Sequence, residues 1–314
     1  MRDDSISIAK GFAILLMVLA HTYFSQYANW WINMFHMPLF FFFAGYCFKD
    51  KYLQTPRIFL QKRIIGLYKP FVKWSVVFLL LHNIFFHLNI YNGEYGFKGS
   101  VSFLYDWKDY AICFVHIVTR MSDNEQLLGG YWFLKSLFVG SIIGYFVIIH
   151  TKQKAIFVGG GSLLIVTIVL ALVCKNMPYF EIGAKEFLAA EFFVLGYYYK
   201  KSKCKVHEKF YIVPLGIVMV TFGTHFYQAT LLNFQWWQVV PYMITAITGI
   251  LMVFYISKKI VSQNSARSKW LVYIGNNTLT ILTWHMLSFK IVSLIIIPIT
   301  AVHENPLTFQ KVTI

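Results

Sequence analysis

Lys10 and His21 stand eleven residues apart within one apolar stretch, residues 5–24. A helix turns by about 100° per residue, so eleven steps bring the amine and the imidazole to one face, about 16 Å apart along the axis. An apolar stretch of about 20 residues is long enough to cross a bilayer as a helix. Ionisable groups at membrane depth are costly, and most of them face a bundle interior or a wet cavity where they bind or react. The spacing therefore makes this pair the first candidate site.

His21 has the chemistry of a general base, because an imidazole can accept a proton near neutral pH. The alternative is a polar residue that hydrogen-bonds across helices. Lys10 can bind an anionic ligand that arrives from the cytoplasm, or its amine can extend to the interface without binding anything. The residues alone leave both alternatives open for each side chain.

His36 opens the next apolar run at a depth similar to that of His21, and Pro38 follows it. It is a candidate second base or a partner that fixes the tautomer of His21; the alternative is an interfacial histidine beside an aromatic belt. His285 is another histidine at membrane depth, in the last apolar run. The distribution of the histidines indicates proton handling near the outer face, although interfacial preference explains part of it.

Lys62, Arg63 and Lys69, with Pro70 after them, stand at the cytoplasmic entry of the third apolar run. Clustered cations can clamp the phosphates of a nucleotide-like donor. The alternative is the ordinary positive charge of a cytoplasmic loop.

The composition defines the class of protein that must hold these groups. Of 314 residues, 58% are hydrophobic and 13% are charged, and the mean hydropathy is +0.58. The charged share is about half of that in soluble domains. These values exclude a soluble or disordered chain and predict an all-α polytopic integral membrane protein. We expect the first apolar run to be a retained helix, because it carries Lys10 and lacks a small-residue cleavage site.

The net charge of +15 does not indicate a nucleic-acid partner, because Lys and Arg gather in short loops. Four scattered cysteines without a CxxC pair argue against a disulfide framework and against a zinc site, so no metal is expected. The residues carry no signal for an oligomeric state.

Nine apolar spans are predicted, at 5–24, 30–48, 68–90, 131–149, 155–174, 184–199, 209–226, 238–257 and 272–297. The alternate loops that begin with the N-terminus hold most of the basic residues, which predicts a cytoplasmic N-terminus. We expect one membrane domain over residues 1–314, with a cytoplasmic amphipathic elbow at 50–67 and a long outer-face segment at 91–130. Nine spans leave the C-terminus outside, and the tail suggests a chain that stops before a tenth helix.

Two strings resemble the bacterial acyltransferase-3 family: Ser7-Ile-Ala-Lys10 with His21 after it, and Phe35-His-Met-Pro-Leu-Phe-Phe-Phe-Phe-Ala-Gly-Tyr-Cys-Phe-Lys49. Within that family the chain is most similar to the fucose 4-O-acetylase-like branch. Further matching strings are Lys62-Arg63 with Lys69-Pro70, Tyr131-Trp-Phe-Leu134, Phe193-Val-Leu-Gly-Tyr-Tyr198 and Ile274-Gly-Asn-Asn-Thr-Leu with His285.

The resemblance implies about ten transmembrane helices in a multi-pass protein of the bacterial cytoplasmic (inner) membrane. It implies transfer of an acyl group, commonly acetyl from cytoplasmic acetyl-CoA, to a hydroxyl of a cell-surface or lipid-linked glycan. A basic residue followed by a catalytic histidine is the family hallmark, which Lys10 and His21 match. Donor binding is associated with a basic element before a proline; here its second basic position is Gly66, which leaves Arg63 with Lys62 and Lys69. Relatives often carry Asp where this chain has Ser7.

Residues and resemblance together predict a membrane O-acyltransferase. His21 would take the proton of the acceptor hydroxyl, and Lys10 would hold a phosphate or stabilise negative charge in the transition state. The main alternative is a transporter or flippase of a lipid-linked glycan that uses Lys10 and His21 as a coupling site. A weaker alternative is a membrane sensor without catalysis.

Overall fold

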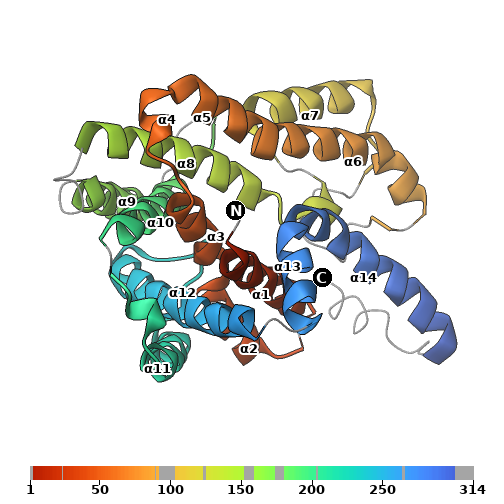
Figure 1. Ribbon diagram of the computed structural model, residues 1–314. Coiled ribbons are helices and arrows are strands. Elements are labelled where there is room, and N and C mark those ends of the chain that lie inside the picture. The colour runs from red at the N-terminus through yellow and green to blue at the C-terminus, as the bar shows by residue number, and fades with distance from the viewer. Residues whose placement is uncertain are drawn as a thin grey trace.

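The computed structural model describes residues 3–22, 24–88, 90–91, 103–122, 125–151, 159–173, 180–202, 204–263 and 266–300. No β-strand runs through any of these ranges, so the predicted all-α class is confirmed for them. The helices are α1 (Asp4–Ala20), α2 (Gln26–Asn33), α3 (His36–Tyr46), α4 (Lys51–Gln54), α5 (Pro56–Arg63), α6 (Lys69–His87), α7 (Trp107–Arg120), α8 (Trp132–Thr151), α9 (Gly161–Val173), α10 (Ala184–Lys201), α11 (Ile212–Phe226), α12 (Val239–Ser262), α13 (Ala266–Asn276) and α14 (Thr278–Thr300). In Figure 1, α1 lies in the middle of the molecule, and it packs against α3, α12 and α13.

Several helices have the length and composition of membrane spans. Within the described residues, three are long and apolar enough to cross a bilayer, over Pro56–His87, Trp132–Thr151 and Trp236–Ser262. Outward faces of α9 and α11 also carry exposed aliphatic and aromatic side chains, such as Val169 and Phe222. Large exposed apolar faces of this kind are more stable in contact with lipid than with water. These are the features of a multi-pass membrane protein; the nine spans, the cytoplasmic N-terminus and the single domain stay predictions.

Two of the predicted spans are interrupted in the structure. Residues 30–48 divide between α2 and α3 at Met34 and Phe35. Pro38 has no N–H to donate to the carbonyl four residues earlier, that of Met34, and its ring disfavours a continuous helix there. The Tyr242 hydroxyl donates to the nearby carbonyl of Asn33 (3.3 Å). Residues 272–297 divide between α13 and α14 at Asn277. There the asparagine amide donates to the carbonyl of Tyr273 (2.9 Å), a local bond that competes with helical continuation.

The segment predicted as an elbow is mostly helical and continuous with the next span. After α4, helix α5 begins at Pro56, and a π-helical turn at Ile64–Tyr68 joins it to α6 without a break. The uninterrupted helix covers Pro56–His87, 32 residues. A π turn inside an α-helix inserts one extra residue and re-aims the side chains after it.

The predicted outer segment 91–130 contains a helix that we did not expect. Helix α7 begins with a capping box in which Asp106 and Asp109 each accept the other's backbone N–H. It lies along α6 (Figure 1). The hydroxyl of Tyr68, in the π-helical turn before α6, donates to the Val118 carbonyl of α7 (2.7 Å). The rest of that prediction at 92–102 and 123–124, and the tail at 301–314, lie outside the described residues.

Glycines allow two pairs of helices to touch backbone to backbone. A Cβ on Gly45 of α3 would overlap the Phe193 carbonyl of α10, and one on Gly196 of α10 would overlap the Phe42 carbonyl of α3. Gly275 of α13 meets α1 at the Ser7 carbonyl in the same way. Small residues at such crossings let membrane helices approach closely. These contacts set the positions of α1 and α3.

Candidate active site

A cavity of about 710 Å³ lies against α1, α3, α8 and the beginning of α14. Four charged side chains line it, those of Asp3, Lys10, Lys49 and Lys200. Most of the remaining lining is apolar: Ile6, Ile14, Phe40, Phe43, Ala44, Leu67, Phe133, Leu134, Leu137, Leu279 and Leu282. A cationic rim over apolar walls suits a ligand with anionic groups at one end and an uncharged remainder.

Lys10 lies on the cavity side of α1, between Ser7 and Ile14, which also line the cavity. The hydroxyl of Ser7 donates to the side-chain oxygen of Asn276 (3.0 Å). Serine therefore ties α1 to the end of α13. The Cβ-free Gly275 beside it allows that approach.

His21 caps the C-terminal end of α1 and is half-buried. Its Nδ1 donates to the Met17 carbonyl oxygen (2.8 Å). A carbonyl can only accept, so Nδ1 carries the proton and Nε2 presents its lone pair when the ring is neutral. The last residue of α1 on the cavity wall is Ile14, and seven further residues place His21 about 10 Å beyond it along the axis.

The structure brings His285 of α14 to His21, with ring centroids 5.2 Å apart in an edge-on arrangement. Its Nδ1 donates to the carbonyls of Leu282 (2.9 Å) and Ile281 (3.2 Å). Its Nε2 is buried and has no hydrogen-bond partner in the described part of the chain. Sequence reasoning noted this histidine at membrane depth but did not assign it to the site, because spacing along the chain does not show which helices adjoin α1.

His36 is the first residue of α3 and is almost fully buried. Its Nδ1 donates to the Ile32 carbonyl (2.8 Å), and it lies close enough to His21 for their charges to interact. The carbonyl of Met17, and not His36, meets Nδ1 of His21 and thereby selects its tautomer.

Of the four cations predicted to bind the donor, Lys10 lines the cavity, whereas Lys62, Arg63 and Lys69 lie outside its described lining. The guanidinium of Arg63 sits over the rings of Phe59 (5.1 Å) and Phe193 (5.5 Å). Lys62 and Lys69 are exposed. From this part of the chain only Gly66 and Leu67 are seen on the cavity wall. Their role in donor binding stays a prediction.

Lys49 and Lys200 are the cavity cations that sequence reasoning missed, since it counted them only as loop charge. Lys49 follows α3, and Lys200 lies in the last turn of α10, where its Nζ stands 5.5 Å from the centroid of the Tyr46 ring. Tyr46 itself lines the cavity. The signal available in the sequence was the position of both lysines at the predicted cytoplasmic ends of apolar runs.

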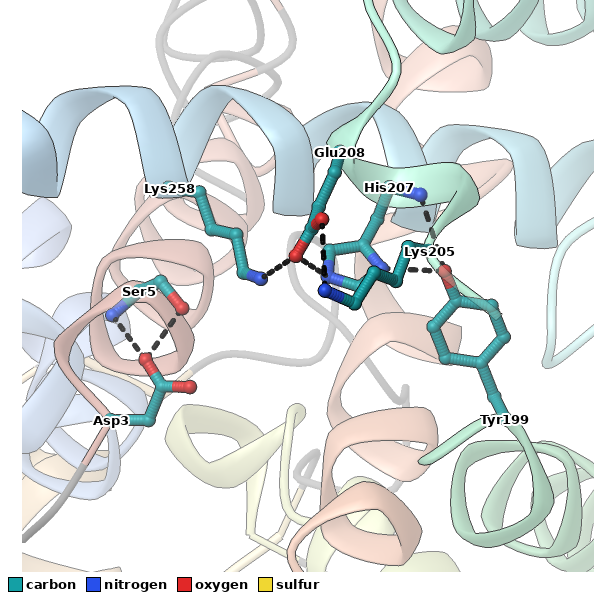
Figure 2. Close-up of polar contacts among 7 residues, drawn as sticks. All are labelled: Asp3, Ser5, Tyr199, Lys205, His207, Glu208 and Lys258. Atoms are coloured by element: carbon teal, nitrogen blue, oxygen red, sulfur yellow. Dashed lines mark hydrogen bonds and ion pairs between the residues drawn. The ribbon is translucent and has the colours of Figure 1, made fainter. Parts of the chain in front are cut away.

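Asp3 lines the cavity, and Figure 2 shows it with a polar cluster around His207. It caps α1 by accepting from the backbone N–H (3.0 Å) and the hydroxyl (2.6 Å) of Ser5. Across the view, Glu208 pairs with Lys258 of α12 (3.1 Å) and with Lys205 (3.7 Å). The hydrogen bond from Lys258 lowers the pKa of the Glu208 carboxyl.

His207 lies at the centre of this cluster. Its Nδ1 meets the Tyr199 hydroxyl (2.6 Å), and its ring stacks on Phe254 of α12 at 4.3 Å between centroids. Burial, reinforced by the positive charge of Lys258, lowers the pKa of His207 from 6.5 to about 4. The ring is therefore neutral at physiological pH and holds the α10–α11 connection against α12.

The described residues contain no group of three or more His, Cys, Asp or Glu side chains arranged to hold a metal ion. The cavity and the histidines beyond it therefore offer two kinds of group: cations for an anionic ligand, and imidazoles that accept protons.

Comparison with curated proteins and with solved structures gives no match. The sequence model of the acyltransferase-3 family, described as an acyltransferase domain, matches residues 3–309. That match covers nearly the whole chain, including the cavity and the three histidines. The chain belongs to the acyltransferase-3 family.

Proposed function

We propose that this protein is a membrane-bound O-acyltransferase that moves an acetyl group from cytoplasmic acetyl-CoA to a hydroxyl of a cell-surface or lipid-linked glycan. The observation that carries the proposal is the arrangement along α1, with Lys10 on a cation-lined cavity and His21 two turns beyond that cavity. We also propose that the chain belongs to the fucose 4-O-acetylase-like branch of the family, which would make a sugar the acceptor. The protein would lie in the bacterial inner membrane with its N-terminus in the cytoplasm.

Coenzyme A carries several phosphates, and the three lysines of the cavity supply complementary charge. We place the phosphates at Lys49 and Lys200, which are exposed, and the thioester arm along the apolar walls. Lys10 lies deeper on α1, where its charge can hold a phosphate or stabilise the oxyanion that forms on the thioester carbonyl. Lys62, Arg63 and Lys69 would attract the donor from outside the cavity.

The proposed transfer is direct. Nε2 of His21 removes the proton from the acceptor hydroxyl, and the oxygen attacks the thioester carbonyl carbon. The carbon–sulfur bond then breaks, the acetyl group remains on the acceptor oxygen, and the thiolate of coenzyme A takes up the proton from His21. His36 would act as a second base beside His21.

Transfer by purified protein in liposomes tests this proposal, with labelled acetyl-CoA and a panel of octyl glycosides of fucose, glucose and galactose as acceptors. His21→Ala should lower the rate about 10²–10⁴-fold, because that is the usual contribution of a general base. The variant should still insert in the membrane, and its elution on size exclusion serves as the control. Rates like those of the parent would refute the role of His21, and movement of a lipid-linked glycan without acetylation would favour the transporter.

A further inference from the structure

The tautomers of His21 and His285 are set in the same way. In each ring Nδ1 donates to a backbone carbonyl one turn earlier, Met17 for one ring and Ile281 and Leu282 for the other. Since those carbonyls only accept, both neutral rings keep their lone pair at Nε2. Two hydrogen-bond acceptors cannot bond to each other, so neither Nε2 atom can donate a hydrogen bond to the other.

His285 is the ring that contacts His21 within the described residues. It is 5% exposed, and its Nε2 has no partner among the described groups. The surroundings are apolar: Phe289 lies 6.0 Å from the ring centroid, and Leu282 and the Cβ-free Gly130 adjoin it. Buried polar atoms in proteins nearly always have a hydrogen-bond partner. Nε2 of His285 lies beside a candidate base, and a ligand hydroxyl could donate the hydrogen bond that it lacks.

We propose that His285 is a second acceptor-binding residue, whose Nε2 accepts a hydrogen bond from a hydroxyl next to the one that His21 deprotonates. The inference rests on the proposed function and narrows its substrate class to acceptors with two neighbouring hydroxyls, as on a sugar ring. A single hydroxyl satisfies one Nε2, whereas two adjacent hydroxyls satisfy both. The same contact would orient the attacking oxygen.

The experiment compares acceptors and variants together. The probes are the octyl glycosides that the parent protein acetylates and their analogues that lack one hydroxyl adjacent to the acetylated position. For the parent, loss of the neighbouring hydroxyl should lower kcat/KM about 10-fold to 100-fold, because a buried acceptor then stays unpaired. In His285→Leu the ratio of kcat/KM for the complete acceptor to kcat/KM for its deoxy analogue should fall to about one. His285→Gln, whose carbonyl oxygen can stand near the former Nε2, should keep part of it.

The outcomes are distinct. A merely structural role for His285 would slow the complete and the deoxy acceptor equally in His285→Leu, and the unchanged ratio would overturn the proposal. If His21 and His285 instead share a proton, the ratio in His285→Leu is again unchanged, and this result also overturns the proposal. If the parent acetylates no glycoside, the proposed function fails together with this inference; if it acetylates them without regard to the neighbouring hydroxyl, only the inference fails.

Discussion

At the scale of residues, each histidine of the site is held by a hydrogen bond to a backbone carbonyl close to it in the chain. His21, His36 and His285 all commit Nδ1 to a backbone carbonyl about one turn earlier. This fixes the ring orientation before any substrate binds, and leaves Nε2 as the basic atom. A base held in this way loses little freedom in the transition state, which favours catalysis by positioning.

Cys47 offers a direct test of where the donor binds, because it is exposed and lines the cavity with Lys10 and Lys49. In a variant whose other cysteines are replaced by serine, acetyl-CoA, whose thiol is blocked as a thioester, should slow the alkylation of Cys47 by N-ethylmaleimide several-fold. Mass spectrometry of the labelled protein measures the rate. Cys204, which is exposed and outside the described lining, serves as the matched control in a variant that keeps only that thiol. Equal rates with and without acetyl-CoA at Cys47 would contradict a donor site in this cavity.

The residues of the site were only partly predictable. The helical spacing of Lys10 and His21 is a local property, so the sequence shows that they share a face. His285, Lys49 and Lys200 reach the site through the packing of α14, α3 and α10, and no local pattern encodes which helices become neighbours. The stacking of Arg63 on Phe59 and Phe193 is likewise a tertiary property.

At the scale of elements, glycine contacts hold the walls of the cavity. Gly45, Gly196 and Gly275 lie within the strings that resemble the acyltransferase-3 family, and each faces a carbonyl of the neighbouring helix. The apolar runs predicted most helices, because a long hydrophobic segment in lipid has few alternatives to a helix. Hydropathy missed the breaks at Met34–Phe35 and at Asn277, since it records neither the missing N–H of Pro38 nor a side-chain hydrogen bond to the backbone such as that of Asn277.

Gly196→Ala should destabilise the protein strongly, because the new methyl group would overlap the Phe42 carbonyl and push α3 away from α10. Overpacking usually costs about 1–3 kcal/mol, and a clash with backbone belongs at the upper end of that range. Thermal unfolding in detergent, followed by tryptophan fluorescence, measures the effect. Gly161→Ala is the matched control, since no atom lies within 4 Å of its added Cβ. An equal Tm for both variants would refute the close contact.

At the scale of the whole molecule, the ends of several helices meet in the cluster around His207. The titratable or charged groups in this cluster are Asp3 of α1, Tyr199 of α10, Lys205 and Glu208 of the connection, and Lys258 of α12. The contacts of His207, Glu208 and Lys258 hold the α10–α11 connection against α10 and α12. Titration of the cluster should therefore affect the stability of the complete bundle.

The pKa of His207 predicts the direction of that effect. Because burial lowers the pKa from 6.5 to about 4, the unfolded chain binds a proton in this interval that the folded protein does not. Stability is thus full above pH 6.5 and falls as the pH drops toward 4, by about 1–2 kcal/mol near pH 5 for this residue. His207→Gln should reduce the loss of Tm between about pH 7 and about pH 5 by a few degrees. The same loss in the variant and the parent would show that His207 is protonated in the folded state.

The backbone contacts of α1 with α13 and of α3 with α10 also bear on the range of donors. Helices that touch through glycine cannot approach further, and two sides of the cavity therefore keep a constant span. For the proposed enzyme, the length of acyl chain that fits is then decided by side chains such as Phe40 of α3 and Phe133 of α8, which line the cavity. To accept longer acyl chains, the enzyme would need smaller side chains in place of these phenylalanines, and the positions of the helices could stay unchanged.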